Sequence, residues 1–304
     1  MKVSVGQFDP SGDVNENLSV MRAQAEEAKA AGAELILFPE ESMFTVGKVE
    51  GNLISAVNEH WSAFVQKLSF IAAETGIALI AGGYEASGEE RPYNTLVIVD
   101  ATGRIVDTYR KLHLYDAFSY QESTKIKPGD GGLKLVEIGG LRVGVMTCYD
   151  VRFPEMARGL ADQGADLICV AAAWFKGDHK IEHWETLLKA RAIENTCWVA
   201  AAGTSSSHTV GHSAILDPMG IVQDYLNDEP RGVVTVDVTR RRIDEVREFL
   251  PVLRNRRLAS TVDVVWTMKT CTHLSRTALR VSLCSKAPRM SSAPILSPRP
   301  STCI

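Results

Sequence analysis

The sequence lacks the features that mark membrane-spanning, secreted and nucleic-acid-binding proteins. No apolar run in its 304 residues approaches the roughly 20 residues that span a bilayer. The first residues lack the apolar core and the cleavage pattern of a secretion signal. A formal net charge of -4 offers no basic surface to nucleic acid or to an anionic membrane. We therefore expect no nucleic acid and no membrane among its partners.

Cysteine is scarce, and its spacing suggests no pairing. The six cysteines form neither a C-x-x-C motif nor a disulfide-like pattern, which predicts a reducing, cytoplasmic location. The rest of the composition is that of a globular protein, with 45% hydrophobic and 23% charged residues. A chain of this length and composition is long enough for one large α/β domain with a substantial core.

Strand-like and helix-like segments alternate along most of the chain. The short, continuous apolar run at residues 35–38 is typical of a strand covered on both faces. Residues 95–99 with 105–109, and 133–138 with 141–146, predict hairpins. Alternation combined with hairpins favours a layered α/β fold with mixed sheets over a purely parallel one. Residues 112–132 have no clear period and predict a long loop of the kind that usually has a function.

The composition changes after about residue 258. Residues 261–304 contain a single acid, Asp263, against six basic residues, together with half of the cysteines and a run rich in Ser and Pro. We expect a domain over residues 1–258, followed by a poorly ordered, atypical basic tail with Ser, Pro and Cys over 259–304. An unusual extension and an altered reading frame would both give this composition.

Three chemically distinct side chains, Glu40, Lys111 and Cys148, each lie just past the end of a predicted strand. Strand ends at one edge of a sheet converge in space, and α/β enzymes often place their sites there. A carboxylate, an ammonium and a thiol supply the base, the oxyanion cation and the nucleophile of acyl transfer. Two alternatives stay open: Cys148 as a small buried hydrophobe, and Glu41 in place of Glu40 as the base.

Three motifs around these residues resemble the signatures of the nitrilase (carbon–nitrogen hydrolase) superfamily. They are LILFPE at residues 35–40, YRKLHL at 109–114 and VMTCYDVRFPE at 145–155, in the family's order. The resemblance extends over roughly residues 1–255. It implies an α/β fold of nitrilase type, a four-layer αββα sandwich with mixed sheets. It also implies no metal, no organic cofactor, and pairing of sandwiches into a homodimer or a larger homo-oligomer.

The resemblance also implies a role for each site residue. Glu40 would be the general base and later the acid, Lys111 the oxyanion cation, and Cys148 the nucleophile that becomes a thioester. The backbone amide of Tyr149 would be the second oxyanion donor. Glu122 resembles an additional family glutamate that positions the lysine and the substrate; a solvated loop acid is the alternative.

The residues that follow the cysteine indicate a branch of the family. The run CYDVRFPE resembles the amidase branch that contains ω-amidase and deaminated-glutathione amidase, whereas true nitrilases typically have Trp-Glu there. In this branch the arginine at the place of Arg152 binds a substrate carboxylate, which suits its bidentate fork; a structural pair with Asp150 is the alternative. Residues 111–118 look more like the bacterial deaminated-glutathione amidases. Trp174 falls where ω-amidase relatives tend to carry a Phe against the substrate chain.

The sequence therefore predicts hydrolysis of a small carboxylate-bearing amide to an acid and ammonia through a thioester, with deaminated glutathione as the leading substrate. ω-Amidase activity on α-ketoglutaramate, N-carbamoyl hydrolysis and nitrile hydrolysis are the alternatives within the family. A catalytically idle binding or scaffold protein and a cysteine-based redox sensor are alternatives from other classes. His179 and His183 have i,i+4 spacing but no third ligand, which favours a helix-entry surface over a metal site.

Overall fold

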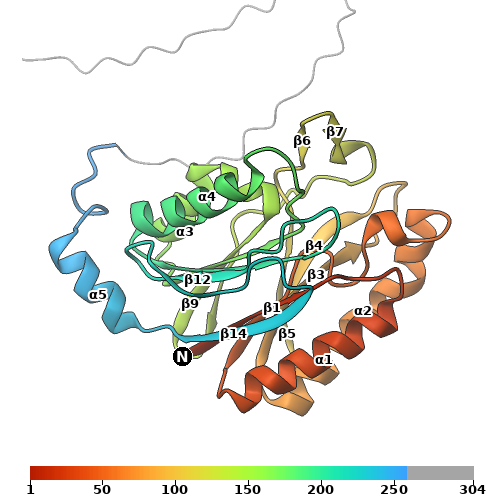
Figure 1. Cartoon of the computed structure of the whole chain (residues 1–304), viewed down its shortest axis with the longest axis horizontal. Helices are drawn as coiled ribbons and strands as arrows, with labels where there is room; N and C mark the ends of the chain where they lie inside the picture. The colour runs from red at the N-terminus through yellow and green to blue at the C-terminus, as the bar shows by residue number, and fades with distance from the viewer. Residues whose placement is uncertain (259–304) are drawn as a thin grey trace, which may run out of the picture. The chain divides into compact units, whose positions relative to one another are not determined.

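Two six-stranded sheets face each other in this protein, and helices cover their outer faces (Figure 1). The structure is a computed structural model that describes residues 1–258. The predicted tail over 259–304 lies outside the described residues. The arrangement is the four-layer αββα sandwich with mixed sheets that the sequence predicts, so this expectation is confirmed.

The first sheet carries the N-terminal strands and one late strand. Its order is β14-β1-β2-β3-β4-β5, with bounds β14 (Arg231–Asp237), β1 (Lys2–Phe8), β2 (Leu35–Leu37), β3 (Ala78–Glu85), β4 (Tyr93–Val99) and β5 (Ile105–Arg110). The central strands β1, β2 and β3 pair in parallel, and β4, β5 and β14 are added antiparallel. Helices α1 (Val14–Ala30) and α2 (Leu53–Thr75) cover its outer face. The left-handed Gly76 ends α2, as glycine commonly does.

The second sheet is built entirely from the middle of the chain. Its order is β13-β12-β11-β10-β9-β8, with bounds β13 (Val222–Tyr225), β12 (Ala214–Leu216), β11 (Trp198–Gly203), β10 (Leu167–Ala172), β9 (Leu141–Thr147) and β8 (Leu135–Ile138). Strands β9, β10 and β11 run parallel. Helices α3 (Pro154–Asp162) and α4 (Lys180–Asn195) lie on its outer face.

Three parts of the chain differ from the sequence-based expectation. The expected loop at 112–132 contains a hairpin, β6 (Asp116–Ala117) with β7 (Tyr120–Gln121), and the 3-10 helix η2 (Glu122–Thr124). The sequence predicts that strands at residues 221–225 and 232–238 complete one sheet, but they belong to different sheets, because β14 returns to pair with β1. Helix α5 (Arg240–Phe249) was not predicted, since its apolar stripe is only Ile243 and Val246 among charged residues. A further short 3-10 helix, η1, spans Val46–Lys48.

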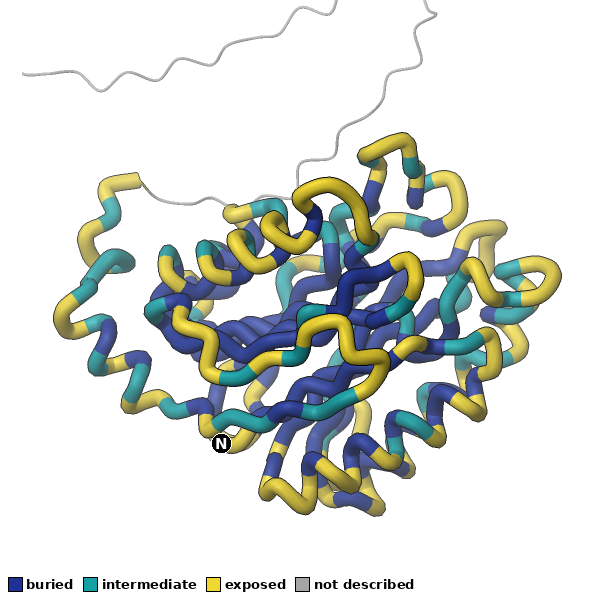
Figure 2. Tube along the Cα trace, in the orientation of Figure 1, coloured by how far each residue is buried: buried dark blue, intermediate teal, exposed yellow. Residues whose placement is uncertain are grey.

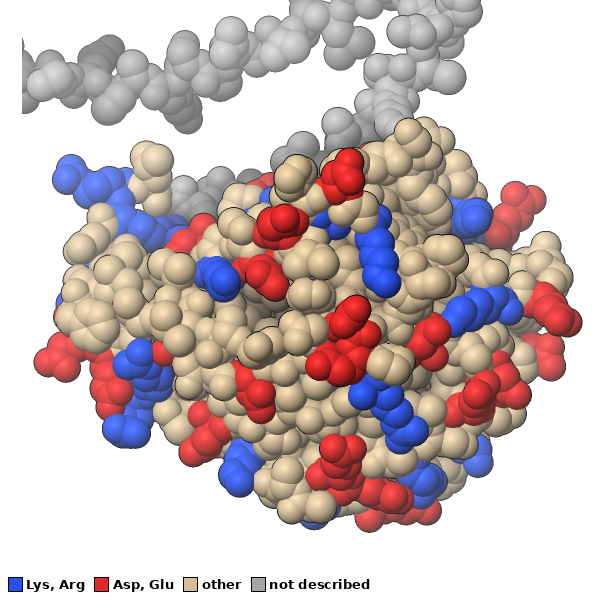
Figure 3. Space-filling view, viewed as in Figure 1, with Lys and Arg blue, Asp and Glu red and all other residues tan. Residues whose placement is uncertain are grey.

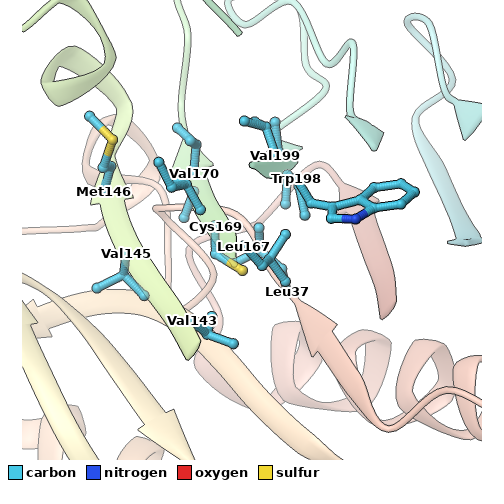
Figure 4. Packing of buried hydrophobic residues seen from close by; sticks show 14 of the residues in the cluster. Leu37, Val143, Val145, Met146, Leu167, Cys169, Val170, Trp198 and Val199 are labelled. Carbon is cyan, nitrogen blue, oxygen red and sulfur yellow. The ribbon is translucent and has the colours of Figure 1, made fainter. Parts of the chain in front are cut away.

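The apolar core fills the space between the two sheets. Figure 4 shows Leu37 of β2 in one cluster with Val143 of β9 and with Leu167 and Cys169 of β10. A second cluster lies between the first sheet and helices α1 and α2. Because both faces of the sheets are covered, the central strands are buried along their length, whereas the helices expose one side (Figure 2). This burial explains the continuous apolar runs of the sequence.

The surface of the described residues carries charge of both signs. On the face shown in Figure 3, acidic and basic side chains are interspersed. Within residues 1–258, every helix is too short or too polar to cross a bilayer. The same residues include no group of three or more His, Cys, Asp or Glu side chains arranged to hold a metal ion.

Candidate active site

The turn after β9 positions Cys148 in a buried cavity. The 3-10 helix η3 (Cys148–Arg152) follows the strand directly, and α3 then begins at Pro154. Cys148 has a φ of 46°, in the left-handed region that costs a non-glycine residue energy. Its side chain lines the cavity, and the residue is 7% exposed. A strained backbone held by its surroundings is typical of a functional residue.

Asp150 holds this turn from inside. Its carboxylate accepts a hydrogen bond from the Thr147 amide at 2.9 Å and one from the Tyr109 hydroxyl at 2.6 Å. His113 contacts the same carboxylate through its amide at 3.1 Å and its Nδ1 at 2.7 Å. Asp150 is completely buried. The alternative in which Asp150 pairs with Arg152 is therefore not what the structure shows within residues 1–258.

Lys111 lies between two carboxylates at the base of the cavity. Its Nζ donates to Glu40 Oε1 at 2.8 Å and to Glu122 Oε2 at 2.9 Å. All three residues are less than a tenth exposed. Glu122 also accepts a hydrogen bond from the Tyr115 amide at 2.7 Å. The alternative of a solvated loop acid for Glu122 is wrong, because this carboxylate is buried and paired.

Glu40 is fixed by donors from three directions. Besides Lys111, it accepts from Asn94 Nδ2 at 2.7 Å and from the Ala173 amide at 2.7 Å. Gly82 of β3 permits the close approach of the Glu40 backbone, since a Cβ at this glycine would lie 2.0 Å from the Glu40 carbonyl oxygen. Such packing leaves the carboxylate one orientation.

Glu41, the sequence competitor of Glu40, makes different contacts. Its Oε1 accepts from the Tyr84 hydroxyl at 2.7 Å and from the Val46 amide at 3.3 Å. Burial, with the neighbouring charge of Glu40 as a smaller cause, raises the pKa of Glu41 to about 7. Both acids line the cavity, but only Glu40 contacts Lys111. The geometry thus favours Glu40.

Electrostatics set the resting charges of Lys111 and Cys148. Burial alone would lower the pKa of Lys111, but the carboxylates of Glu122 and Glu40 outweigh it and raise this pKa well above the usual value. Burial, and then the negative charge of Glu40, raise the pKa of Cys148 well above its usual value, with Lys111 opposing them. The thiol and the Glu40 carboxylate line the same cavity. Lys111 is therefore an ammonium at rest, and Cys148 is a neutral thiol beside a base.

The three side chains come from two sheets. Glu40 follows β2 and Lys111 follows β5, which end at the same edge of the first sheet because both run parallel to β3. Cys148 follows β9 in the facing sheet. The expectation that one sheet edge brings all three together is correct for the acid and the amine only.

Trp174 and Arg152, the two predicted substrate-binding residues, lie in different places. Trp174 lines the cavity and is 2% exposed, and its Nε1 donates to the Lys180 carbonyl at 2.8 Å. The Arg152 guanidinium carbon lies 4.7 Å from the centroid of the Trp174 ring, and its Nη2 is 3.4 Å from His183 Nδ1. Arg152 is not among the described residues that line the cavity around Cys148.

Sequence reasoning missed two side chains, Asn94 and Lys180. Asn94 is the second residue of β4 and lies beside Glu40, and an asparagine inside an apolar strand is itself unusual. That mismatch is a signal that points to a polar role. Lys180 lines the cavity although it is the first residue of α4. No pattern distinguishes it from an ordinary lysine at a solvated helix start.

The chemistry of the cavity is that of acyl transfer through a thiol. A neutral thiol, a fixed carboxylate and a permanent ammonium share a space of about 50 Å³, which admits a small acyl group. Fold and constellation together define a protein of the αββα class equipped for acyl transfer, the chemistry of amide hydrolysis.

Comparisons with known proteins name the family. The model of the carbon-nitrogen hydrolase family matches residues 2–248, and the chain belongs to this family. It is 36% identical over 259 residues to the deaminated glutathione amidase of Escherichia coli O157:H7, covering 85% of this chain and 98% of that protein. It is 32% identical over 255 residues to the 2-oxoglutaramate amidase of Bacillus subtilis, covering 82% and 95%.

A solved structure extends the likeness to the fold. A mutant of the amidase from Nesterenkonia sp. AN1, of the nitrilase superfamily, superposes with a TM-score of 0.73 at 28% identity, covering 84% of this chain and 94% of that one. In that structure the acetamide moiety of fluoroacetamide has added covalently at the active site cysteine. The resemblance read from three sequence motifs is thus confirmed over most of the chain.

Proposed function

We propose that the protein hydrolyses a small carboxylate-bearing amide through a thioester on Cys148. The observation that carries this proposal is the buried ammonium of Lys111 between Glu40 and Glu122, in the lining of the same cavity as the Cys148 thiol. This arrangement supplies a base, a nucleophile and a cation without further groups. The covalent adduct on the cysteine of the Nesterenkonia amidase supports a nucleophilic role for the equivalent thiol.

In the first half-reaction, Glu40 takes the proton of Cys148, and the thiolate attacks the amide carbon. Because the pKa of Cys148 is raised, the thiol needs this base and does not ionise by itself. Lys111 and the backbone amide of Tyr149, in the first turn of η3, stabilise the oxyanion of the tetrahedral intermediate. The carbon–nitrogen bond then breaks, and the leaving nitrogen receives the proton from Glu40.

In the second half-reaction, a water molecule opens the thioester. Glu40 removes a proton from the water as it attacks, and the oxyanion forms in the same place as before. When the intermediate collapses, the carbon–sulfur bond breaks and Cys148 regains its proton. Glu122 keeps Lys111 in place through both halves, because its carboxylate balances the ammonium while Glu40 exchanges protons.

We propose deaminated glutathione as the substrate, since the E. coli relative bears that name. The amide of that compound is secondary, so its hydrolysis releases a peptide amine, whereas a primary amide such as 2-oxoglutaramate releases ammonia. The B. subtilis relative named for 2-oxoglutaramate keeps ω-amidase activity as the second candidate. N-carbamoyl compounds would release carbon dioxide as well, and nitriles would add water first.

The experiment is a panel of these substrates with the purified chain, with ammonia, free amine and carbon dioxide measured in parallel. We expect turnover of the deaminated peptide or of 2-oxoglutaramate, and an acyl adduct on Cys148 seen by mass spectrometry after acid quenching. The Cys148→Ala variant should show neither. A folded native protein that hydrolyses nothing in the panel would leave a binding or scaffold role, and would refute the proposal.

We also propose that the domain of residues 1–258 forms a homodimer or larger homo-oligomer in the cytoplasm. Large apolar side chains stay exposed over the end of α4 and β13, at Ile193, Ile221 and Tyr225. The cysteines that the structure describes are free thiols, as in a reducing compartment. Light scattering should give at least twice the chain mass for the native protein, and less for Ile221→Glu. A monomeric native protein would contradict the assembly.

A further inference from the structure

Three lysines line the cavity around Cys148, and they differ in how their charge is balanced. Lys111 contacts two carboxylates. Lys125 is exposed, so water solvates it. Lys180 is only 5% exposed and has no acid within ion-pair distance in residues 1–258. A buried charge without an opposite partner is costly, and such groups are normally paired or coordinate a ligand.

Local backbone geometry turns Lys180 into the cavity. Gly177 and His179 have φ values of 150° and 57°, which bend the chain sharply before α4. Trp174 Nε1 donates to the Lys180 carbonyl, and this bond fixes the start of the helix against the cavity wall. The first residue of a helix usually extends to solvent, but here its side chain points inward. The inward position is therefore built by the loop of residues 174–179.

The partners of the Lys180 ammonium are neutral. Its Nζ donates to the Tyr115 hydroxyl at 3.2 Å and lies 4.7 Å from the ring centroid of Phe118 and 4.8 Å from that of Trp174. Aromatic faces attract a cation, but they accept no conventional hydrogen bond. Since an ammonium has three donors, the tyrosine leaves two for a ligand. Burial and the nearby Arg152 lower the pKa of Lys180, which an added anion would reverse.

Arg152 adds a second unbalanced cation. It contacts the same Trp174 ring, and it has no acidic partner in the described part of the chain. Its Nε is buried and makes no hydrogen bond there. Lys180 and Cys148 line the same cavity, so a ligand held by Lys180 would share the space of the nucleophile. Two cations lack an acidic partner in the described residues: Lys180 in the cavity lining and Arg152 on the same Trp174 ring. Together they make a site for an anionic group.

We propose that Lys180 binds the carboxylate at the far end of the substrate's acyl half. Arg152, which contacts the same Trp174 ring, adds positive charge without contacting the carboxylate directly. The proposal rests on the proposed function and narrows its substrate class to amides of dicarboxylic acids. The acyl half is the part concerned, because it stays in the cavity as a thioester while the amine leaves. Lys180, which lines the cavity, therefore takes the direct contact that the sequence assigned to Arg152.

The test compares two primary amides that differ only in the terminal group, glutaramate with a carboxylate and pentanamide with a methyl. We expect native protein to prefer glutaramate in kcat/KM, and Lys180→Met to lower this preference about 100-fold, as for the loss of a hydrogen-bonded charge. Lys180→Glu should reverse the preference toward 5-aminopentanamide, which carries an ammonium. The matched control is Lys176→Met, an exposed lysine in the same loop, which should retain the native preference. An unchanged preference in Lys180→Met would overturn the proposal.

A binding measurement separates this proposal from the proposed function. Glutarate, the acid product, is titrated calorimetrically into Cys148→Ala and into the double variant Cys148→Ala/Lys180→Met. We expect at least a tenfold weaker affinity in the double variant, whether or not the native protein hydrolyses any amide. Equal affinities would refute the role of Lys180 and leave the hydrolytic proposal intact. Lys180→Gln, which keeps a polar end, serves as the second variant if the methionine variant does not fold.

Discussion

Lys111 and Lys180 are both buried in the lining of one cavity, and the protein treats their charges in opposite ways. Two carboxylates within the fold neutralise the amine of Lys111. Aromatic rings and one hydroxyl surround the amine of Lys180 without neutralising it. The first arrangement belongs to the catalytic apparatus, which must be complete before substrate arrives. The second leaves charge for the substrate to neutralise, so binding energy and specificity are concentrated there.

The largest expected effect is the difference in stability between the Lys111→Met and Lys180→Met variants. Lys111→Met leaves two buried carboxylates unpaired and should lower the free energy of unfolding by about 3–5 kcal/mol, besides abolishing activity. Lys180→Met removes an unbalanced buried charge, so its free energy of unfolding should equal or exceed the native value. Urea denaturation of both variants measures the difference. If the two variants lost equal stability, the contrast between a neutralised Lys111 and an unneutralised Lys180 would be wrong.

Removing one of the two acids that contact Lys111 tests the surroundings of this lysine alone. Glu122→Gln keeps the shape but leaves Lys111 with a single carboxylate, Glu40. We expect kcat to fall about 10- to 100-fold, from the loss of a charge-assisted hydrogen bond, with a smaller change in KM. Steady-state kinetics on the best substrate measure it. The same change at Glu41, which does not contact Lys111, should have a much smaller effect on kcat.

Glu41 is the acidic counterpart of Lys180, because it too has no oppositely charged partner in residues 1–258. Its pKa is about 7 in the fold against 4.5 in the unfolded chain, so the folded state holds the proton more tightly. The stability it contributes is present below pH 4.5 and is lost as pH rises through 7. Glu41→Gln should remove about 1–2 kcal/mol of this pH dependence, measured by denaturation at pH 5 and pH 8. An unchanged dependence would contradict the assignment.

The smallest expected effect concerns the pH dependence of glutaramate binding at Lys180. Since the pKa of Lys180 is lowered, this amine loses its charge at a lower pH than an ordinary lysine. The KM for glutaramate should therefore rise several-fold in the alkaline range, while the KM for pentanamide stays level. Lys180→Arg should keep the KM for glutaramate flat over that range, since the guanidinium stays charged.

The catalytic side chains around Lys111 were predictable from the sequence, and the inward position of Lys180 was not. Glu40, Lys111 and Cys148 each lie in a sequence motif just past the end of a predicted strand, so a local pattern finds them. The position of Lys180 depends on a loop bend and on a facing tyrosine at residue 115, neither of which leaves a period or a motif. The division of the triad between two sheets was also hidden, because strand patterns show burial and not which sheet a strand joins.

Strand β14 has a consequence for how the protein is made. It pairs along the whole of β1 and forms the edge of the sheet that carries Glu40 and Lys111. A ribosome releases the chain from its N-terminus, so the nucleophile emerges while this sheet still lacks its last strand. The base and the cation reach their final scaffold only after residue 237 has been synthesised. Translation itself thus delays the appearance of hydrolytic activity until nearly the whole domain exists.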